Sequence, residues 1–300
     1  VYEYMGPAWY QREIEIPAAW KGKRIFLYFE RTHWLSSVYV GKEEVSKIDY
    51  ISIPHNHELT QWLHPGKKEL ITFCIDNRYQ YDTHKWDHAH SEFTQINWNG
   101  VLGEIKLVAV DPVYVDDMQV YPDIKNKSIK VKMTVRNCTE HTASGKISFH
   151  VTGKDYRLQK EVPVTVTDSI TYIEEEMFLG KDIHLWNEFH PNLYTLDCKL
   201  TSSVDGQSYA HEKSTTFGMR EVEAGEDHII LNGEPIHLRG TVENAVFPKT
   251  GYAPVDDASW ERVLRILKEY GMNHMRFHSW CPPAAAFRMA DKLGVNADVG

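Results

Sequence analysis

The stretch MRFHSWCPP, residues 275–283, places four reactive or ligand-binding side chain types just before two prolines. They are an arginine, a histidine, a tryptophan and a cysteine: Arg276, His278, Trp280 and Cys281. If the residues before the prolines are extended, Arg276 and His278 share one face, because side chains alternate along a strand. The proline after Cys281 restricts that residue to extended backbone. No signature of a cysteine hydrolase accompanies it, so we expect no nucleophilic thiol here.

A second group of candidate ligands lies in YDTHKWDHAHSEFTQINWNG, residues 81–100. His88 and His90 share a face if this stretch is extended, and His84 with two nearby aspartates completes a set of metal-type donors. The stretch also reads as a long loop, and polar, aromatic-rich loops on a rigid scaffold suit ligand recognition. Three interpretations stay open: a substrate-pocket loop, a solvated loop or a metal site. We favour the first, and expect neither a bound metal nor a cofactor.

Composition limits the classes of function. The net charge of -9 argues against a nucleic-acid partner, which usually requires a basic face. The chain has no apolar run long enough to cross a membrane. No signal peptide is recognised, but the sequence starts within a strand-like pattern, VYEYMGPAWYQREIEIP, which is consistent with a leader that has been removed. Its four cysteines form no CxxC pair, which excludes a zinc ribbon, and the only plausible disulfide joins Cys138 to Cys198. The 12% aromatic content fits β-sandwiches and also carbohydrate binding, although most tryptophans are expected in the core.

The first part of the chain, to about residue 220, alternates apolar and polar residues in short runs separated by turn signals. This pattern predicts a β-sandwich or barrel, with only HELTQWL, residues 57–63, looking briefly helical. A boundary is expected near Pro112, because proline disfavours a strand interior. Seven further strand-like runs follow, and their number and spacing match an immunoglobulin-like sandwich over residues 113–218.

The pattern changes after Phe217. The Asn232-Gly233 pair predicts a tight hairpin. Residues 256–271 form an amphipathic helix pattern, with Asp256 or Asp257 as the N-cap, Gly271 as the stop and one apolar stripe made of Trp260, Val263, Leu264, Leu267 and Tyr270. The strand NHMRFHS, a second helix over residues 282–294 and a further strand, VNADVG, follow. Strands that alternate with helices predict a parallel sheet.

Four stretches carry a resemblance to a known family. They are GPAWYQREIEIPAAWKGKRIFLYFE, LTQWLHPGKKELITFCIDN, QINWNGVLGEIKL, and LNGEPIHLRG followed by Pro248. In this order, over most of the chain, they resemble glycoside hydrolase family 2, which includes β-galactosidases, β-glucuronidases and β-mannosidases. The resemblance implies a mainly β chain: a jelly-roll sugar-binding-like sandwich (1–112, with N-terminal strands expected to be missing), an immunoglobulin-like β-sandwich (113–218) and the first units of a truncated (β/α)8 catalytic barrel (219–300).

The resemblance further implies the N-terminal portion of a retaining exo-acting β-glycosidase that hydrolyses terminal β-linked sugars with two glutamates. Both are expected beyond Gly300, so no catalytic residue is assigned in this chain, and the fragment alone is expected to be inactive. Active sites of such barrels lie where strands end and their following loops begin. His278 is expected to hydrogen-bond a sugar hydroxyl, Trp280 to stack on a sugar ring, and Arg276 to point into the barrel.

Further substrate contacts are expected from Asn244 and from His88 and His90 of the long loop. Around Asn244 the sequence departs from the family pattern, which usually has a basic residue and a histidine after the Arg-Gly pair. Here Glu243 and Asn244 stand at those positions, while Arg239 is expected to anchor the barrel by a buried pair.

The expected partner is therefore a carbohydrate, with homo-oligomers formed through the sandwich domains and a periplasmic or secreted location. One rival is a non-catalytic carbohydrate-binding or scaffold module made of the two sandwiches. Another is an adhesion protein of tandem sandwiches, against which the strand and helix alternation after residue 230 argues.

Overall fold

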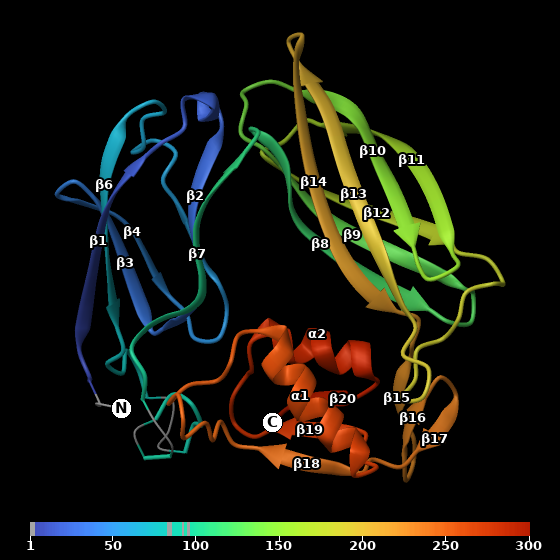
Figure 1. Cartoon of the computed structure of the whole chain (residues 1–300). Helices are drawn as coiled ribbons and strands as arrows, with labels where there is room; N and C mark the ends of the chain where they lie inside the picture. Colours follow the sequence, from blue (N-terminus) through green and yellow to red (C-terminus); the bar gives the residue numbers. More distant parts are fainter. Residues whose placement is uncertain (1–3, 83–85, 92, 95–96) are drawn as a thin grey trace. The chain divides into compact units, whose positions relative to one another are not determined.

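The structure, a computed structural model, describes residues 4–82, 86–91, 93–94 and 97–300 (Figure 1). The chain forms two compact units, each of which is described by itself. The first unit consists of Val1–Ala109, Arg239–Ala290 and Val295–Gly300, and the second of Val110–Leu238 and Asp291–Gly294. No helix of the described residues is long and apolar enough to cross a membrane.

The first unit begins with a sandwich of two antiparallel sheets. One sheet has the order β1 (Pro7–Glu15), β6 (Lys68–Asp76), β3 (Leu35–Val40) and β4 (Glu43–Asp49). The other has the order β5 (His55–Glu58), β2 (Arg24–His33) and β7 (Gly100–Val110), with the short 3-10 helix η1 (Ala18–Trp20) between β1 and β2. Alternate apolar residues of both sheets, among them Ile25, Phe29, Val38 and Ile75, form its buried core.

The helical interpretation of residues 57–63 is wrong. His57 belongs to strand β5, and a turn follows in which the Leu63 amide donates to the Leu59 carbonyl over 3.1 Å. His55, His57 and Leu59 are each fully buried, so the segment alternates with the period of a strand rather than that of a helix.

The second unit contains a sandwich in which all residues are described. Its four-stranded sheet has the order β11 (Arg157–Val166), β10 (Ala143–Thr152), β13 (Leu193–Val204) and β14 (Gln207–Gly218), and its three-stranded sheet β12 (Ile170–Phe178), β9 (Ser128–Asn137) and β8 (Val113–Asp123). All pairings are antiparallel. The suggested Cys138–Cys198 disulfide is absent: Cys138 is exposed, and the buried Cys198 thiol lies 3.6 Å from the sulfur of Met133.

The predicted hairpin is confirmed in the second unit. Strands β15 (Val222–Ala224), β16 (Ile229–Leu231) and β17 (Glu234–Ile236) form a small antiparallel sheet. Asn232 and Gly233 connect the last two with φ angles of 55° and 85°. Both values lie in the left-handed region that a two-residue hairpin turn requires and that Asn-Gly adopts readily.

The first unit ends in a parallel sheet, as predicted. Its order is β18 (Gly240–Glu243), β19 (His274–Phe277) and β20 (Asn296–Val299), and helices α1 (Asp257–Glu269) and α2 (Ala284–Leu293) connect the strands. Asp256 is the N-cap of α1, since its carboxylate accepts the Ser259 amide over 2.8 Å. Trp260, Leu264 and Leu267 are buried as the stripe predicts. Tyr270 is not: it is 78% exposed, because the helix ends at Glu269 and the chain turns away.

Candidate functional site

The carboxyl ends of β18 and β19 meet at one point of the parallel sheet. The carbonyl oxygen of Glu243, the last residue of β18, accepts two hydrogen bonds from the chain that follows β19. The His278 amide donates to it over 3.0 Å and the indole nitrogen of Trp280 over 3.2 Å. His278 and Glu243 are thereby fixed at the strand ends, the place where parallel α/β folds hold their ligand sites.

A loop of the first sandwich reaches this point. The rings of His88 and His278 lie 5.2 Å apart between centroids, inclined by 54°. His278 is exposed and His88 half-buried, so both present imidazole nitrogens that can donate or accept hydrogen bonds. Two residues predicted separately as substrate contacts therefore form one pair.

Glu243 adds a half-buried carboxyl group to the pair. Its Oε2 accepts the Ala245 amide over 3.0 Å and its Oε1 the Val246 amide over 3.3 Å. Burial raises the pKa of this carboxyl group, and the three amides of residues 244–246 and nearby His88 act in the opposite direction. From the sequence alone, Glu243 is only a departure from the family pattern. Its position as the last residue before the first βα-loop was the signal that marks it as a site residue.

Trp280 is positioned differently from the prediction. Only 3% of it is exposed, and its ring packs on Phe277 and Phe247 at centroid distances of 5.6 and 6.2 Å. No open face is left for a sugar ring, so the stacking role does not hold in this structure. The indole instead supports the end of β18 through its bond to the Glu243 carbonyl. The inward packing of Trp280 is favourable because it buries a large apolar area while the indole N–H keeps a hydrogen-bond partner.

Arg276 and Asn244 lie at the same end of the sheet. Arg276 is exposed, whereas its neighbours Met275 and Phe277 are buried under the helices, so Arg276 and His278 share the open face as alternation predicts. The Arg276 guanidinium group lies close to the backbone of Gly300. Asn244 is half-buried, and its amide oxygen is buried with no hydrogen-bond partner among the described residues. A ligand hydroxyl therefore does not reach that oxygen in this structure.

His90 lies behind the site rather than in it. It is 7% exposed, its ring lies 5.3 Å from that of His33, and its Nε2 is 3.4 Å from the Ser52 hydroxyl. Burial, together with His33 and Arg31 nearby, holds its pKa well below the usual range. Direct contact of His90 with a substrate is therefore not available in this structure, since the turn over residues 87–91 directs His88 outward and His90 inward.

The metal interpretation of the loop has no support in the described part of the chain. Among those residues, no group of three or more His, Cys, Asp or Glu side chains is arranged to hold a metal ion. His84, the third histidine of that interpretation, lies outside the described residues. Cys281 is half-buried, and burial raises the pKa of its thiol, which opposes a nucleophilic thiolate.

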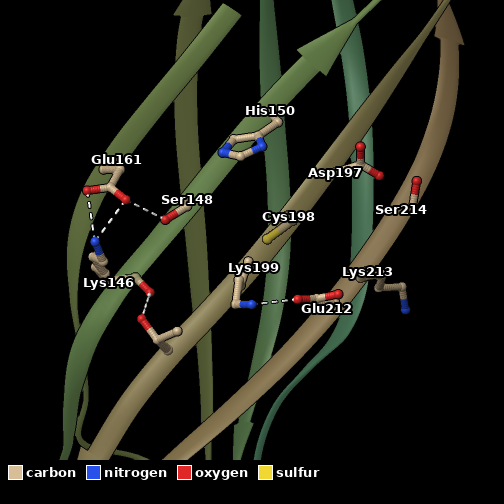
Figure 2. Close-up of a pocket in the computed structure, with 11 residues that line it drawn as sticks. Lys146, Ser148, His150, Glu161, Asp197, Cys198, Lys199, Glu212, Lys213 and Ser214 are labelled. Carbon is tan, nitrogen blue, oxygen red and sulfur yellow. Dashed lines mark hydrogen bonds and ion pairs between the residues drawn. The ribbon is translucent and has the colours of Figure 1, made fainter.

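A hollow of about 660 Å³ lies in the second unit, on the outer face of sheet β11-β10-β13-β14 (Figure 2). His150, Asp197 and Ser214 follow one another across three neighbouring strands there, which resembles a catalytic triad in composition. The order is wrong for that chemistry, because Asp197 stands between the imidazole and the hydroxyl that it would have to deprotonate. The flanking lysines are in ion pairs, Lys146 with Glu161 and Lys199 with Glu212. This face fits a solvated sheet surface.

Comparisons with known proteins point to one family. Residues 113–220 match the family model of glycosyl hydrolases family 2. A β-galactosidase of Thermoanaerobacter pseudethanolicus is 22% identical over 98% of this chain, which covers 39% of that protein. A putative β-glucuronidase of Formosa agariphila is 25% identical over 98% of this chain, which covers 27% of that protein. The chain thus spans well under half the length of either relative.

Solved structures share the fold. The β-glucuronidase 2 of Bacteroides uniformis, covalently bound to cyclophellitol-6-carboxylate aziridine, superposes with a TM-score of 0.81 over 99% of this chain and 36% of its own, at 21% identity. At that identity the likeness concerns the fold alone. The predicted resemblance of the chain to glycoside hydrolase family 2 is confirmed by the match of residues 113–220 to that family model and by these relatives.

Proposed function

We propose that this chain is the N-terminal portion of a retaining, exo-acting β-glycosidase that hydrolyses terminal β-linked sugars. The observation that carries the proposal is the group formed by His88, His278 and the Glu243 carboxyl group at the carboxyl ends of two parallel strands. Polar side chains of this kind fix the hydroxyl groups of a sugar. The relatives, which are named β-galactosidase and putative β-glucuronidase, support the same class of reaction.

In this proposal, strands β18 to β20 begin a (β/α)8 barrel, and the two sandwiches are the jelly-roll and immunoglobulin-like domains of the family. The remaining strands, beyond residue 300, supply two glutamates with carboxyl groups about 5–5.5 Å apart. One protonates the leaving oxygen, and the other attacks the anomeric carbon and forms a glycosyl-enzyme intermediate. Water then releases the sugar, with the first glutamate acting as base.

The residues of this chain act on the substrate before and during that step. We propose that His278 and His88 hydrogen-bond two sugar hydroxyls, which the closeness of their rings supports. Arg276 lies on the open face of β19, which would be the interior of the closed barrel. We also propose a periplasmic or secreted location and homo-oligomers formed through the sandwiches, which a leader sequence and the solution mass of the full-length protein would test.

The experiment is a turnover screen of the full-length protein with aryl β-galactoside, β-glucuronide and β-mannoside. The proposal expects hydrolysis of at least one of them, and no hydrolysis by residues 1–300 alone. Absence of turnover with all three overturns it. If such an inactive protein still binds the parent sugars, the alternative holds: a non-catalytic carbohydrate-binding or scaffold module.

A further inference from the structure

The carboxyl end of strand β2 holds a buried cation. Arg31 is 5% exposed, and its guanidinium group donates a 2.5 Å hydrogen bond to the carbonyl oxygen of Cys281. Burial lowers the pKa of Arg31 to about 10. Its hydrogen-bond partner is a carbonyl in the loop between β19 and α2, three residues after His278. Burying a guanidinium group is unfavourable unless it is hydrogen-bonded, so this bond stabilises the loop in the position where the Cys281 carbonyl meets Arg31.

Two residues further along the same strand, His33 contacts the other loop of the site. Its Nδ1 donates to the carbonyl oxygen of Trp98 over 2.9 Å, and its ring lies 5.3 Å from that of His90. His90 belongs to a turn closed by the Ser91 amide, which donates to the Asp87 carbonyl over 3.1 Å. The same turn carries His88. Arg31 and His33 lie on one side of β2, since they are two residues apart in a strand.

We propose that Arg31 and His33 are positioning residues. Both lie on strand β2 of the first sandwich, and they hold in place the two loops that carry His278 and His88. Arg31 fixes the β19–α2 loop through Cys281, and His33 fixes the 87–91 turn through His90. The first sandwich thus supports both loops of the site. The consequence of this arrangement for catalysis rests on the proposed function, whereas the ordering of the loops does not.

Positioning at this precision matters because small displacements of binding groups reduce a rate strongly; a shift of about 1 Å costs on the order of 100-fold. There is also room for the β19–α2 loop to move. A cavity of about 530 Å³ lies beside the bond between Arg31 and Cys281, and Ser52 and Pro282 also line it. Once the guanidinium bond is lost, the loop can relax into this space. Lysine keeps the positive charge of Arg31 but lacks its planar guanidinium group, so it does not reproduce the geometry of this bond.

The test compares Arg31→Lys with Arg24→Lys in the full-length protein. Arg24 is the matched control, because it lies at the opposite end of β2, where it pairs with Glu58. Hydrogen exchange followed by mass spectrometry reports on residues 276–284 and 86–91, and kcat/KM reports on the site. For Arg31→Lys we expect at least tenfold faster exchange in residues 276–284, a smaller change elsewhere in the first unit and a roughly 10- to 100-fold lower kcat/KM. Arg24→Lys is expected to change neither.

The second variant, His33→Gln, tests the other loop and covers the case in which Arg31→Lys does not fold. It is expected to speed exchange in residues 86–91 more than in residues 276–284. Wild-type exchange in both variants overturns the proposal, and so does faster exchange spread evenly over the first unit, which indicates only a loss of global stability. If the exchange pattern is as expected but the protein hydrolyses no glycoside, the proposed function fails and the positioning role stands.

Discussion

The rings of His88 and His278 lie 5.2 Å apart, although one belongs to a loop of the first sandwich and the other follows the second strand of the parallel sheet. The pair forms because a turn directs His88 outward and because the Glu243 carbonyl fixes the amide of His278. Each residue had a separate interpretation as a ligand contact. Their contact places both at one site and makes the sandwich loop part of it.

The pair predicts coupled losses of activity. His88→Ala and His278→Ala in the full-length protein should each lower kcat/KM by roughly 10- to 100-fold, because each removes a hydrogen bond worth about 1–3 kcal/mol in a site built around it. The double variant should lose less than the sum of the two single effects, since the residues are in contact. His228→Ala, an exposed histidine between β15 and β16, is the control. Single effects that add fully would show that the pair does not act on a common ligand.

The carboxyl group of Glu243 leads us to expect slower hydrolysis of anionic sugars than of neutral ones. Two like charges about 7 Å apart at an effective dielectric of about 20 repel by about 2 kcal/mol, or roughly 30-fold in kcat/KM. Glu243→Gln should therefore improve the ratio of β-glucuronide to β-galactoside hydrolysis by about that factor. Glu226→Gln, on an exposed turn, should leave the ratio unchanged. An unchanged ratio in Glu243→Gln would mean that the carboxyl group serves only to bind the amides of Ala245 and Val246.

Trp280 separates packing from ligand stacking. Trp280→Phe keeps most of the buried aromatic area but removes the hydrogen bond to the Glu243 carbonyl, so the free energy of unfolding should fall by about 1 kcal/mol. Trp280→Ala should cost about 3–5 kcal/mol. Thermal unfolding measures both, with Trp86→Phe as control because Trp86 is 71% exposed. A large rise in KM for Trp280→Phe with an unchanged Tm would restore the stacking role.

The buried histidines of the first sandwich predict acid sensitivity. Burial lowers the pKa of His33 to about 4 and that of His57 to about 3, against about 6.5 in the unfolded chain. Because the folded pKa is the lower one, their contribution to stability is complete above about pH 6.5. It falls by about 1.4 kcal/mol per pH unit for each group as the pH drops toward the folded value.

The measurement is the free energy of unfolding between pH 7.5 and 4. His57→Gln removes one such group and should reduce the slope by about one proton, although it also loses the hydrogen bonds of His57 to Ser36 and Ser46. His150→Gln, an exposed histidine of the second sandwich, should keep the wild-type slope. Equal slopes in His57→Gln and the wild type would contradict the neutral, buried state of His57.

The periodic elements were predictable because their residues report directly on local structure. The Asn232-Gly233 turn, the Asp256 cap and the alternation of Arg276 with buried Met275 and Phe277 all follow from short-range rules. The predictions were wrong where the burial of a residue does not follow from its neighbours in the sequence. Tyr270 continues the helical period but lies beyond the last turn, and His57 looked helical although its burial follows a strand.

The sequence marks single candidate residues of the site but not how they are arranged. Nothing local distinguishes His88, which faces the strand ends, from His90, which lies under the loop against His33. The difference depends on a turn and on contacts with distant strands. The inward packing of Trp280 and the bond from Arg31 to Cys281 likewise depend on tertiary contacts, which no spacing rule encodes.

The most direct test of the account is the anomer that the full-length protein releases first from an aryl β-glycoside, followed by proton NMR. A double displacement by two glutamates predicts that the β-anomer appears first and mutarotates to the α-anomer afterwards. Initial release of the α-anomer would contradict the retaining mechanism, and no release from any of the three aryl glycosides would contradict the glycosidase itself.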